Sequence, residues 1–358
     1  MIVRSAQASL ASRVDGLFTR LAINPSRSAR ARSPSEGLGP VERLERLARL
    51  EEQHRAAIFR AEPERFFGRA GEPGPWTWMP RRPFGSDGHV VEVSWASGYR
   101  PAALEPEVRA AYEAWPENGA MHARLYLHED RPRPTLVLVH GYGGGRFPFE
   151  ERKWPLELFF DRLGLDVAVA VLPFHGPRRR GVRRPLFPSA DPRLTVEGFR
   201  QAVYDLWTLG ARLRARGAPA VGMMGMSLGG YITALSATTD PRLAFAVPVI
   251  PLASIADFAL HAGRLVGTES QVRAQHAALE RVYAPVSPLH RPSRLPPERV
   301  RVLAGAADRV TPVRHAERLA EHFRVDVHVF HGGHLLQFGR REGFEEVARM
   351  LRALDLAR

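Results

Sequence analysis

The sequence predicts an α/β fold, with a mostly parallel central sheet flanked by helices, a helical lid insertion and a helical N-terminal extension. Three observations support this. Short, continuous apolar runs such as 135–139 and 220–226 are typical of strands buried on both faces. Segments with helical spacing separate most of these runs. Glycine-rich turns follow several runs, where parallel sheets hold their ligands.

Composition limits the class of protein. The 358 residues, 44% hydrophobic and 25% charged, suffice for one large core and an extension or cap. No apolar run is long enough to cross a bilayer and no signal peptide is evident, so we expect a cytoplasmic protein. The absence of cysteine excludes disulfides, thiolate zinc sites and a cysteine nucleophile.

The formal net charge of +13 raises the question of a nucleic-acid partner. The basic residues are almost all arginines, and Lys153 is the only lysine. The positive charge is dispersed, apart from 1–33 and 178–184, and lacks the interleaved aromatic residues of a base-stacking surface. We therefore expect no nucleic-acid binding.

Residues 1–88 are expected to form the N-terminal extension. Their first part places Leu10, Val14 and Leu17 at helical spacing in a basic segment, which is typical of a docking helix and also of a membrane-surface helix. Peripheral contact with a membrane or lipid therefore stays open. Since residues 1–33 contribute no strand and no motif, we expect that they are dispensable for any reaction that the protein catalyses.

The rest of the extension and the domain at 89–358 are predicted from periodicity. Residues 26–40 resemble a linker, 41–59 an amphipathic helix and 72–88 an irregular segment. Strands are expected at 89–95, 122–128, 135–139, 166–173, 220–226, 243–250, 300–304 and 325–330. Helices are expected at 156–163, 195–216, 227–237, 312–323 and 341–354. Helix-like and proline-rich material at about 251–298 interrupts the alternation, as a cap or lid over the strand ends would.

The apolar run at 220–226 ends in Gly-Met-Ser-Leu-Gly, residues 225–229, and a helical pattern follows at once. A serine on a sharp strand-to-helix turn needs small residues two positions away on each side, because the turn presses them against neighbouring backbone. The motif predicts a nucleophile elbow, with Ser227 as nucleophile and the Leu228 amide as an oxyanion donor. An ordinary glycine-rich turn would have the same five-residue pattern.

A second glycine-rich segment, His-Gly-Tyr-Gly-Gly-Gly at 140–145, follows the run at 135–139. Small residues let backbone amides approach a substrate oxygen, and we expect the Tyr142 amide to be the second oxyanion donor. His140 and Gly141 are expected to contact substrate. Phosphate binding is the alternative, but the segment lacks the lysine and hydroxyl of a P-loop.

Two candidate partners for the serine follow later strands. Asp308 lies between the run at 300–304 and a helix start at Pro312, and its alternative role is to cap that helix. His334 follows the last strand beyond two glycines and is the candidate base, with His331 as its competitor. Loops after parallel strands meet at one edge of a sheet, so these groups are expected to converge.

The order Ser227, Asp308, His334, each after its own strand, resembles that of the α/β-hydrolase superfamily over about residues 120–358. Four motifs carry the resemblance: the Gly-Met-Ser-Leu-Gly elbow, His-Gly-Tyr-Gly-Gly, Asp-Arg-Val-Thr-Pro and the late Gly-Gly-His. The segment at 172–178, Leu-Pro-Phe-His-Gly-Pro-Arg, is similar to one in a poorly characterised abhydrolase-domain branch.

This resemblance implies a serine esterase, thioesterase or lipase that forms an acyl-enzyme through a Ser-His-Asp triad and needs no cofactor. Its substrate would be a small-molecule acyl ester or thioester. An acyltransferase using the same site and a catalytically silent binding scaffold remain alternatives. A metal hydrolase is not expected, because His122, His128 and His140 form no recognisable ligand set with carboxylates.

A run of five arginines in seven residues, 178–184, follows the expected strand at 166–173. One interpretation is a solvated loop, since charge runs are usually exposed. The other is a loop that recruits an anionic substrate, such as a phospholipid or an acyl-carrier thioester, through bidentate contacts. On the second interpretation Arg178 and Arg179, with the nearby His175, would contact substrate.

Overall fold

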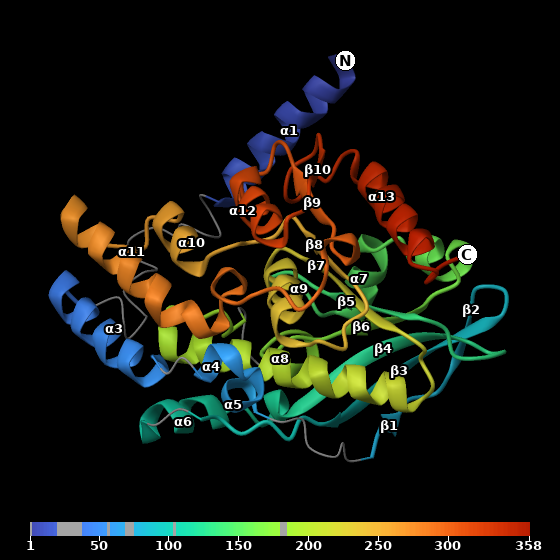
Figure 1. Ribbon diagram of the computed structural model, residues 1–358, viewed down its shortest axis with the longest axis horizontal. Helices are drawn as coiled ribbons and strands as arrows, with labels where there is room; N and C mark the ends of the chain where they lie inside the picture. Colours follow the sequence, from blue (N-terminus) through green and yellow to red (C-terminus); the bar gives the residue numbers. More distant parts are fainter. Residues whose placement is uncertain (1, 20–37, 56–57, 69–74, 103–104, 180–184) are drawn as a thin grey trace.

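The computed structural model describes residues 2–19, 38–55, 58–68, 75–102, 105–179 and 185–358. Its centre is a ten-stranded sheet in the order β1-β3-β4-β6-β5-β7-β8-β9-β10, with β2 paired to β3 (Figure 1). The strands are β1 Thr77–Trp78, β2 Arg82–Phe84, β3 Gly88–Ala96, β4 Ala120–His128, β5 Thr135–Val139, β6 Asp166–Ala170, β7 Val221–Met226, β8 Ala246–Val249, β9 Val302–Gly305 and β10 Val327–Phe330. From β6 to β10 neighbouring strands are parallel, whereas β1 to β4 pair antiparallel.

The central strands are buried along their whole length, as their continuous apolar sequences predict. Every residue of β5, β6 and β7 is buried. Val139 is in register with Ala170 on one side and with Gly225 on the other, so these strands end level with each other. The loops that follow β5 and β7 therefore begin at the same edge of the sheet.

Helices cover both faces of the sheet and create two hydrophobic cores (Figure 1). One core contains residues of α8, α9 and α12, and the other contains residues of η3 and α13. The helical segments of this domain are α6 Pro106–Glu113, η2 Pro116–Gly119, α7 Phe147–Lys153, η3 Leu158–Arg162, η4 Gly176–Arg178, α8 Pro192–Ala215, α9 Leu228–Thr239, α12 Val313–Phe323 and α13 Arg340–Ala353. This arrangement confirms the predicted fold class.

Residues 251–298 and the N-terminal extension form helices that pack on this core. The insertion contains α10 Ile255–His261, α11 Glu269–Tyr283, η5 Ala284–Val286, η6 Pro288–His290 and η7 Pro297–Arg299. The extension contains α1 Ile2–Phe18, α3 Pro40–His54, α4 Ile58–Ala61 and α5 Pro63–Phe67. Helix α3 packs on α11 and α5 packs on α8 (Figure 1). No helix in the described part of the chain has both the length and the apolarity needed to cross a membrane.

Several element boundaries differ from the sequence-based expectations. The helix expected at 41–59 ends at His54, and the segment at 72–88 contains β1 and β2 rather than irregular structure alone. Helices α6 and α7 were not anticipated. The two short strands exist because β3 offers an edge to pair with, for example between Thr77 and Ser94. Such pairing depends on tertiary contact and leaves little periodicity in the sequence.

Candidate active site

Ser227 lies at the tight turn between β7 and α9. Its φ of 57° and ψ of −113° are strained for a residue with a side chain, which is typical of residues held in place for function. A Cβ at Gly225 would lie 2.2 Å from the Gly229 carbonyl oxygen, and one at Gly229 would lie 2.2 Å from the Val139 carbonyl oxygen. Only glycine fits at these two positions, for the steric reason the motif predicted.

The glycine-rich loop after β5 lies directly beside Ser227. A Cβ at Gly141 would come within 3.3 Å of Ser227 Cβ and 3.9 Å of Ser227 Oγ. Leu228 is the first residue of α9, and the first amides of a helix have no partner within that helix. The N-terminus of α9, which carries a partial positive charge, therefore begins directly after Ser227 and close to the small residues of the loop.

Buried polar side chains form hydrogen bonds with the backbone of this loop. His140 Nδ1 donates to the Gly141 carbonyl oxygen at 2.8 Å, and Nε2 accepts from the Leu172 amide at 3.0 Å. Burial lowers the pKa of His140, so the imidazole is neutral and can both donate and accept. Glu150 Oε1 accepts from the Gly145 amide at 3.0 Å. These bonds fix the backbone of the glycine-rich loop that lies beside Ser227.

Asp308 and His334 contact each other at the edge where β9 and β10 end. His334 Nδ1 lies 2.7 Å from Asp308 Oδ2, and the Asp308 side chain is fully buried. Asp308 Oδ1 accepts from the amides of Val310 and Thr311 at 2.8 and 2.7 Å. The carboxylate is thereby oriented from both sides, and Nε2 is the imidazole nitrogen that points away from it.

Two further side chains join these loops to the rest of the edge. Thr311 Oγ1 lies 3.0 Å from the Ile250 carbonyl oxygen and 3.0 Å from His334 Nδ1. Gln337 Nε2 donates to the His334 carbonyl oxygen at 3.0 Å and reaches Met226 Sδ at 3.9 Å. Met226 is the residue before Ser227, so the histidine loop and the turn that carries the serine are in contact.

Comparison with solved structures identifies the fold. An acetyl xylan esterase from a Thermoanaerobacterium species aligns with a TM-score of 0.57 and 17% identity over 83% of this chain and 93% of that one. An acetyl xylan esterase from a Paenibacillus species aligns with a TM-score of 0.55 and 16% identity over 87% and 92%. The chain has the α/β-hydrolase fold.

Comparison at the level of sequence identifies relatives without an assigned activity. No protein-family model matches the chain. Two uncharacterized proteins of Mycobacterium tuberculosis, from two strains, are each 34% identical over 247 residues, which cover 66% of this chain and 58% of theirs. The chain therefore spans somewhat more than half the length of the curated relatives it matches.

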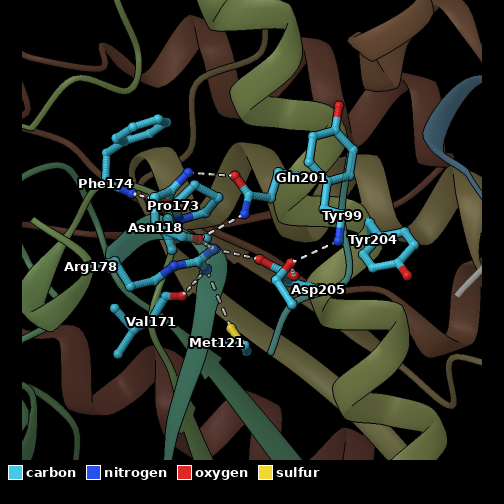
Figure 2. Close-up of polar contacts among 12 residues, drawn as sticks. Tyr99, Asn118, Met121, Val171, Pro173, Phe174, Arg178, Gln201, Tyr204 and Asp205 are labelled. Atoms are coloured by element: carbon cyan, nitrogen blue, oxygen red, sulfur yellow. Dashed lines mark hydrogen bonds and ion pairs between the residues drawn. The ribbon is translucent and has the colours of Figure 1, made fainter. Parts of the chain in front are cut away.

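The buried position of Arg178 contradicts the expected substrate contact. Figure 2 shows its guanidinium between Asp205, Val171 and Met121. The Arg178 side chain is fully buried, and Nη2 lies 2.8 Å from Asp205 Oδ2. A charge withdrawn from water needs such partners, so Arg178 is an internal ion-pair residue rather than part of a solvated or substrate-recruiting surface.

The other expected substrate contacts near this segment also need revision. His175 is fully buried, with Nδ1 2.8 Å from the Pro173 carbonyl oxygen, and burial lowers its pKa well below the usual value. His140 is buried too, so neither imidazole is exposed where the sequence-based prediction expected substrate contact. Arg179 is half-buried, whereas Arg180 and the arginines at 183 and 184 lie outside the described residues.

Sequence reasoning missed Asp15 altogether. This residue of α1 is fully buried and accepts backbone hydrogen bonds from Arg309 and His334, next to the Asp308–His334 pair. Helix α1 therefore contacts the loop that carries His334, although the sequence indicated no role for residues 1–33; residues 20–37 lie outside the described residues. The available indication was an acidic residue in a strongly basic segment, one turn after Ala11.

One group of side chains in the described residues has the composition of a metal site. Asp257, His276 and Glu280, in α10 and α11, place their ligand atoms within 4.8 Å of one another. Each already has a protein partner: His276 Nε2 contacts Asp257 Oδ1 at 2.8 Å, Arg318 pairs with Asp257, and Ser254 donates to Glu280. The positive charge of Arg318 disfavours a cation there, so we assign the group to internal ion pairing.

Proposed function

We propose that the protein is a serine hydrolase that cleaves a carboxylic ester or thioester, with Ser227 as nucleophile, His334 as base and Asp308 as the residue that orients the base. The single observation that carries this proposal is the 2.7 Å contact between His334 Nδ1 and Asp308 Oδ2 at the sheet edge where Ser227 occupies a strained turn. The esterase activity named for both aligned structures supports the reaction class.

In this mechanism His334 Nε2 takes the proton from Ser227 Oγ as that oxygen attacks the acyl carbonyl carbon. Asp308 accepts a hydrogen bond from Nδ1–H, which leaves Nε2 unprotonated and able to act as base. It also stabilises the imidazolium that forms. The tetrahedral oxyanion would accept hydrogen bonds from the backbone amides of Leu228 and Tyr142, and one such donor is worth about 3 kcal/mol of the barrier.

Collapse of the tetrahedral intermediate transfers the His334 proton to the leaving alcohol or thiol and leaves the acyl group on Ser227. Water then attacks the acyl-enzyme with His334 as base, and the acid is released. Attack by a second alcohol or thiol in place of water would make the same site a transferase. Which acceptor wins depends on access to the acyl-enzyme, and product analysis with and without added alcohol distinguishes the two.

The test uses a fluorophosphonate probe, which reacts with an activated serine, and a series of esters of graded chain length. We expect wild-type protein to be labelled and to hydrolyse at least one ester, and Ser227→Ala to do neither while its melting temperature changes little. Labelling and hydrolysis that persist in Ser227→Ala would rule out this nucleophile. A folded wild-type protein that shows neither reaction would instead favour the silent scaffold.

The choice between the two histidines of the loop has its own matched pair of variants. His331 Nε2 lies 2.9 Å from Gln7 Oε1, so its ring faces α1, whereas His334 contacts Asp308. We expect labelling to fail in His334→Ala and to survive in His331→Ala. The reverse pattern would exchange the two assignments.

A further inference from the structure

We propose that Asp15 is a positioning residue that holds the loop carrying His334, so that helix α1 completes the active site. This inference rests on the proposed function, because it concerns the placement of the proposed base. Figure 1 shows α1 (dark blue) beside the ends of β9 and β10 and the start of α12, although these elements are separated from it by most of the chain.

The Asp15 carboxylate joins two loops through their backbone. Its Oδ2 accepts hydrogen bonds from the amides of His334 at 2.6 Å and Arg309 at 3.3 Å, and its Oδ1 accepts from the amide of Leu335 at 3.1 Å. Arg309 directly follows Asp308 in the chain. One carboxylate therefore ties together the two loops whose side chains meet in the Asp308–His334 pair.

Burial makes this arrangement depend on both sides. Asp15 has no exposed surface, and a carboxylate withdrawn from water is stable only where hydrogen bonds replace the lost water. The loop amides supply these bonds, and bonds to a charged acceptor are shorter and stronger than those between neutral groups. Moving the loop would leave the buried carboxylate without hydrogen-bond donors. Removing the carboxylate would leave the loop amides without their acceptor, and the loop would then be less firmly held.

Gly333 gives independent support for a close approach by α1. A Cβ at this position would lie 2.5 Å from Asp15 Oδ2 and 3.2 Å from Ala11 Cβ. Gly333 is not among the glycines with positive φ, so its backbone conformation does not require glycine. The lack of a side chain instead makes room for α1, in contrast to Gly332, whose Cβ would collide with the Phe338 amide nitrogen at 2.2 Å.

The rest of α1 contacts the domain along the same stripe. Gln7 Oε1 lies 2.9 Å from His331 Nε2, and Arg4 forms an exposed ion pair with Glu342 at 2.9 Å. Residues 4, 7, 11 and 15 follow one another at three- and four-residue steps and share one helix face. Of these contacts only those of Asp15 reach the backbone of His334, so its effect can be separated from docking of the helix.

Loss of Asp15 should lower turnover rather than substrate binding, because the His334 side chain acts on the reacting proton and misplacement by about 1 Å can cost about a hundredfold in rate. In the full-length protein we expect Asp15→Ala to lower kcat per active site by about tenfold to a hundredfold with KM little changed. Asp15→Asn, which keeps one acceptor oxygen, should lose less. Gln7→Ala is the matched control on the same helix and should stay within about twofold.

Three measurements test the proposal. Fluorophosphonate titration counts active sites, so that a smaller folded fraction is not mistaken for a slower enzyme. Amide hydrogen exchange reports directly on the His334 and Leu335 amides, which should exchange faster in Asp15→Ala than in wild type and remain protected in Gln7→Ala. Gly333→Ala should reproduce the Asp15→Ala result, because its methyl group displaces the carboxylate.

Each outcome decides the question. A kcat per active site equal to wild type in Asp15→Ala, or unchanged protection of the two amides, overturns the positioning role. A slower enzyme with faster exchange confined to 331–337 supports it. If wild-type protein hydrolyses no ester and resists the probe, the proposed function fails, and amide exchange still decides whether Asp15 holds the loop. Should Asp15→Ala not fold, Asp15→Asn tests the same contacts, with a smaller expected loss of kcat and of amide protection.

Discussion

Arg178 and Asp205 carry opposite charges in a site that water does not reach. The guanidinium also donates to the Asn118 carbonyl oxygen at 2.8 Å and the Val171 carbonyl oxygen at 3.1 Å, and Ser97 donates to Asp205. Desolvation by burial raises the pKa of Asp205, and the Arg178 charge opposes that rise. Removing one charge leaves the other uncompensated, and this cost is much larger than that of an exposed ion pair.

We therefore predict that Arg178→Met lowers the free energy of unfolding by about 3–5 kcal/mol. The double variant Arg178→Met with Asp205→Leu should recover much of this loss, since it buries no charge. Denaturant titrations of the three proteins measure both effects. A loss below about 1 kcal/mol in the single variant would contradict a buried ion pair and would restore the surface interpretation of Arg178.

At the scale of the element, the strand, turn and helix at 221–239 are held by the contacts of two glycines. The atoms that a Cβ at Gly229 would meet belong to the Val139 and His140 backbone at 2.2 and 2.7 Å, in and just after the central strand β5. A flexible side chain could move aside, but the backbone of a strand paired on both sides cannot. The packing of β5 against α9 thus requires glycine at position 229.

We predict that Gly229→Ala destabilises the protein by at least about 3 kcal/mol or prevents folding, because a single methyl group would separate α9 from β5. Gly143→Ala is the matched control: its φ is +80°, but no atom lies within 4 Å of the added Cβ. It should cost only the backbone strain, about 1 kcal/mol. Thermal unfolding of both variants would contradict the packing argument if the two losses were equal.

Helix α1 does not dock through its apolar residues, contrary to what its helical spacing predicts. Leu10 and Leu17 lie on the outside, 51% and 60% exposed, whereas Ala11 and Asp15 are fully buried. The small and polar stripe docks because Ala11 and Asp15 lie against Gly333, and Asp15 accepts hydrogen bonds from the His334 and Leu335 amides. Helical periodicity alone identifies the helix but not which side of it packs, when the partner surface is itself polar.

At the scale of the whole molecule, half-buried His54 and buried His315 lie where separate parts of the chain meet. His54 of α3 contacts the Val282 carbonyl oxygen of α11, and His315 of α12 accepts from the Ala253 amide at 3.3 Å. Burial lowers the pKa of both imidazoles to about 4, below the usual value of about 6.5 for histidine. Both are neutral in the folded protein and would take up a proton on unfolding in mildly acidic solution.

We predict that the free energy of unfolding falls as the pH is lowered from 6.5 to about 4. In this window the unfolded state binds more protons than the folded state, so stability is fully present above pH 6.5 and is lost as the pH falls, by up to about 1.4 kcal/mol per unit for each histidine. Denaturant titrations across this range should show a flatter dependence for His54→Gln with His315→Gln. Equal slopes for the two proteins would contradict it.

Much of the fold and the candidate site could be predicted from local patterns. The strand expected at 135–139 is β5 with the same bounds, and Ser227 lies between a strand and a helix as its motif indicates. Asp308 and His334 come into contact as the order of the motifs suggests, although their catalytic roles remain a proposal. These predictions succeed because periodicity, glycine sterics and the common edge of parallel strands act over a few residues or follow from strand order.

The sequence by itself determined the α/β class, the central strands and the residues that gather at the carboxyl edge of the sheet, because each depends on short-range sterics and burial patterns. Only the tertiary structure decided that Arg178 is buried against Asp205 and that Asp15 binds the amides of a loop 319 residues later. No local sequence pattern indicates whether a charged side chain is solvated or is paired with a buried partner. The partner is chosen by the packing of segments far apart in the chain, where desolvation makes pairing obligatory.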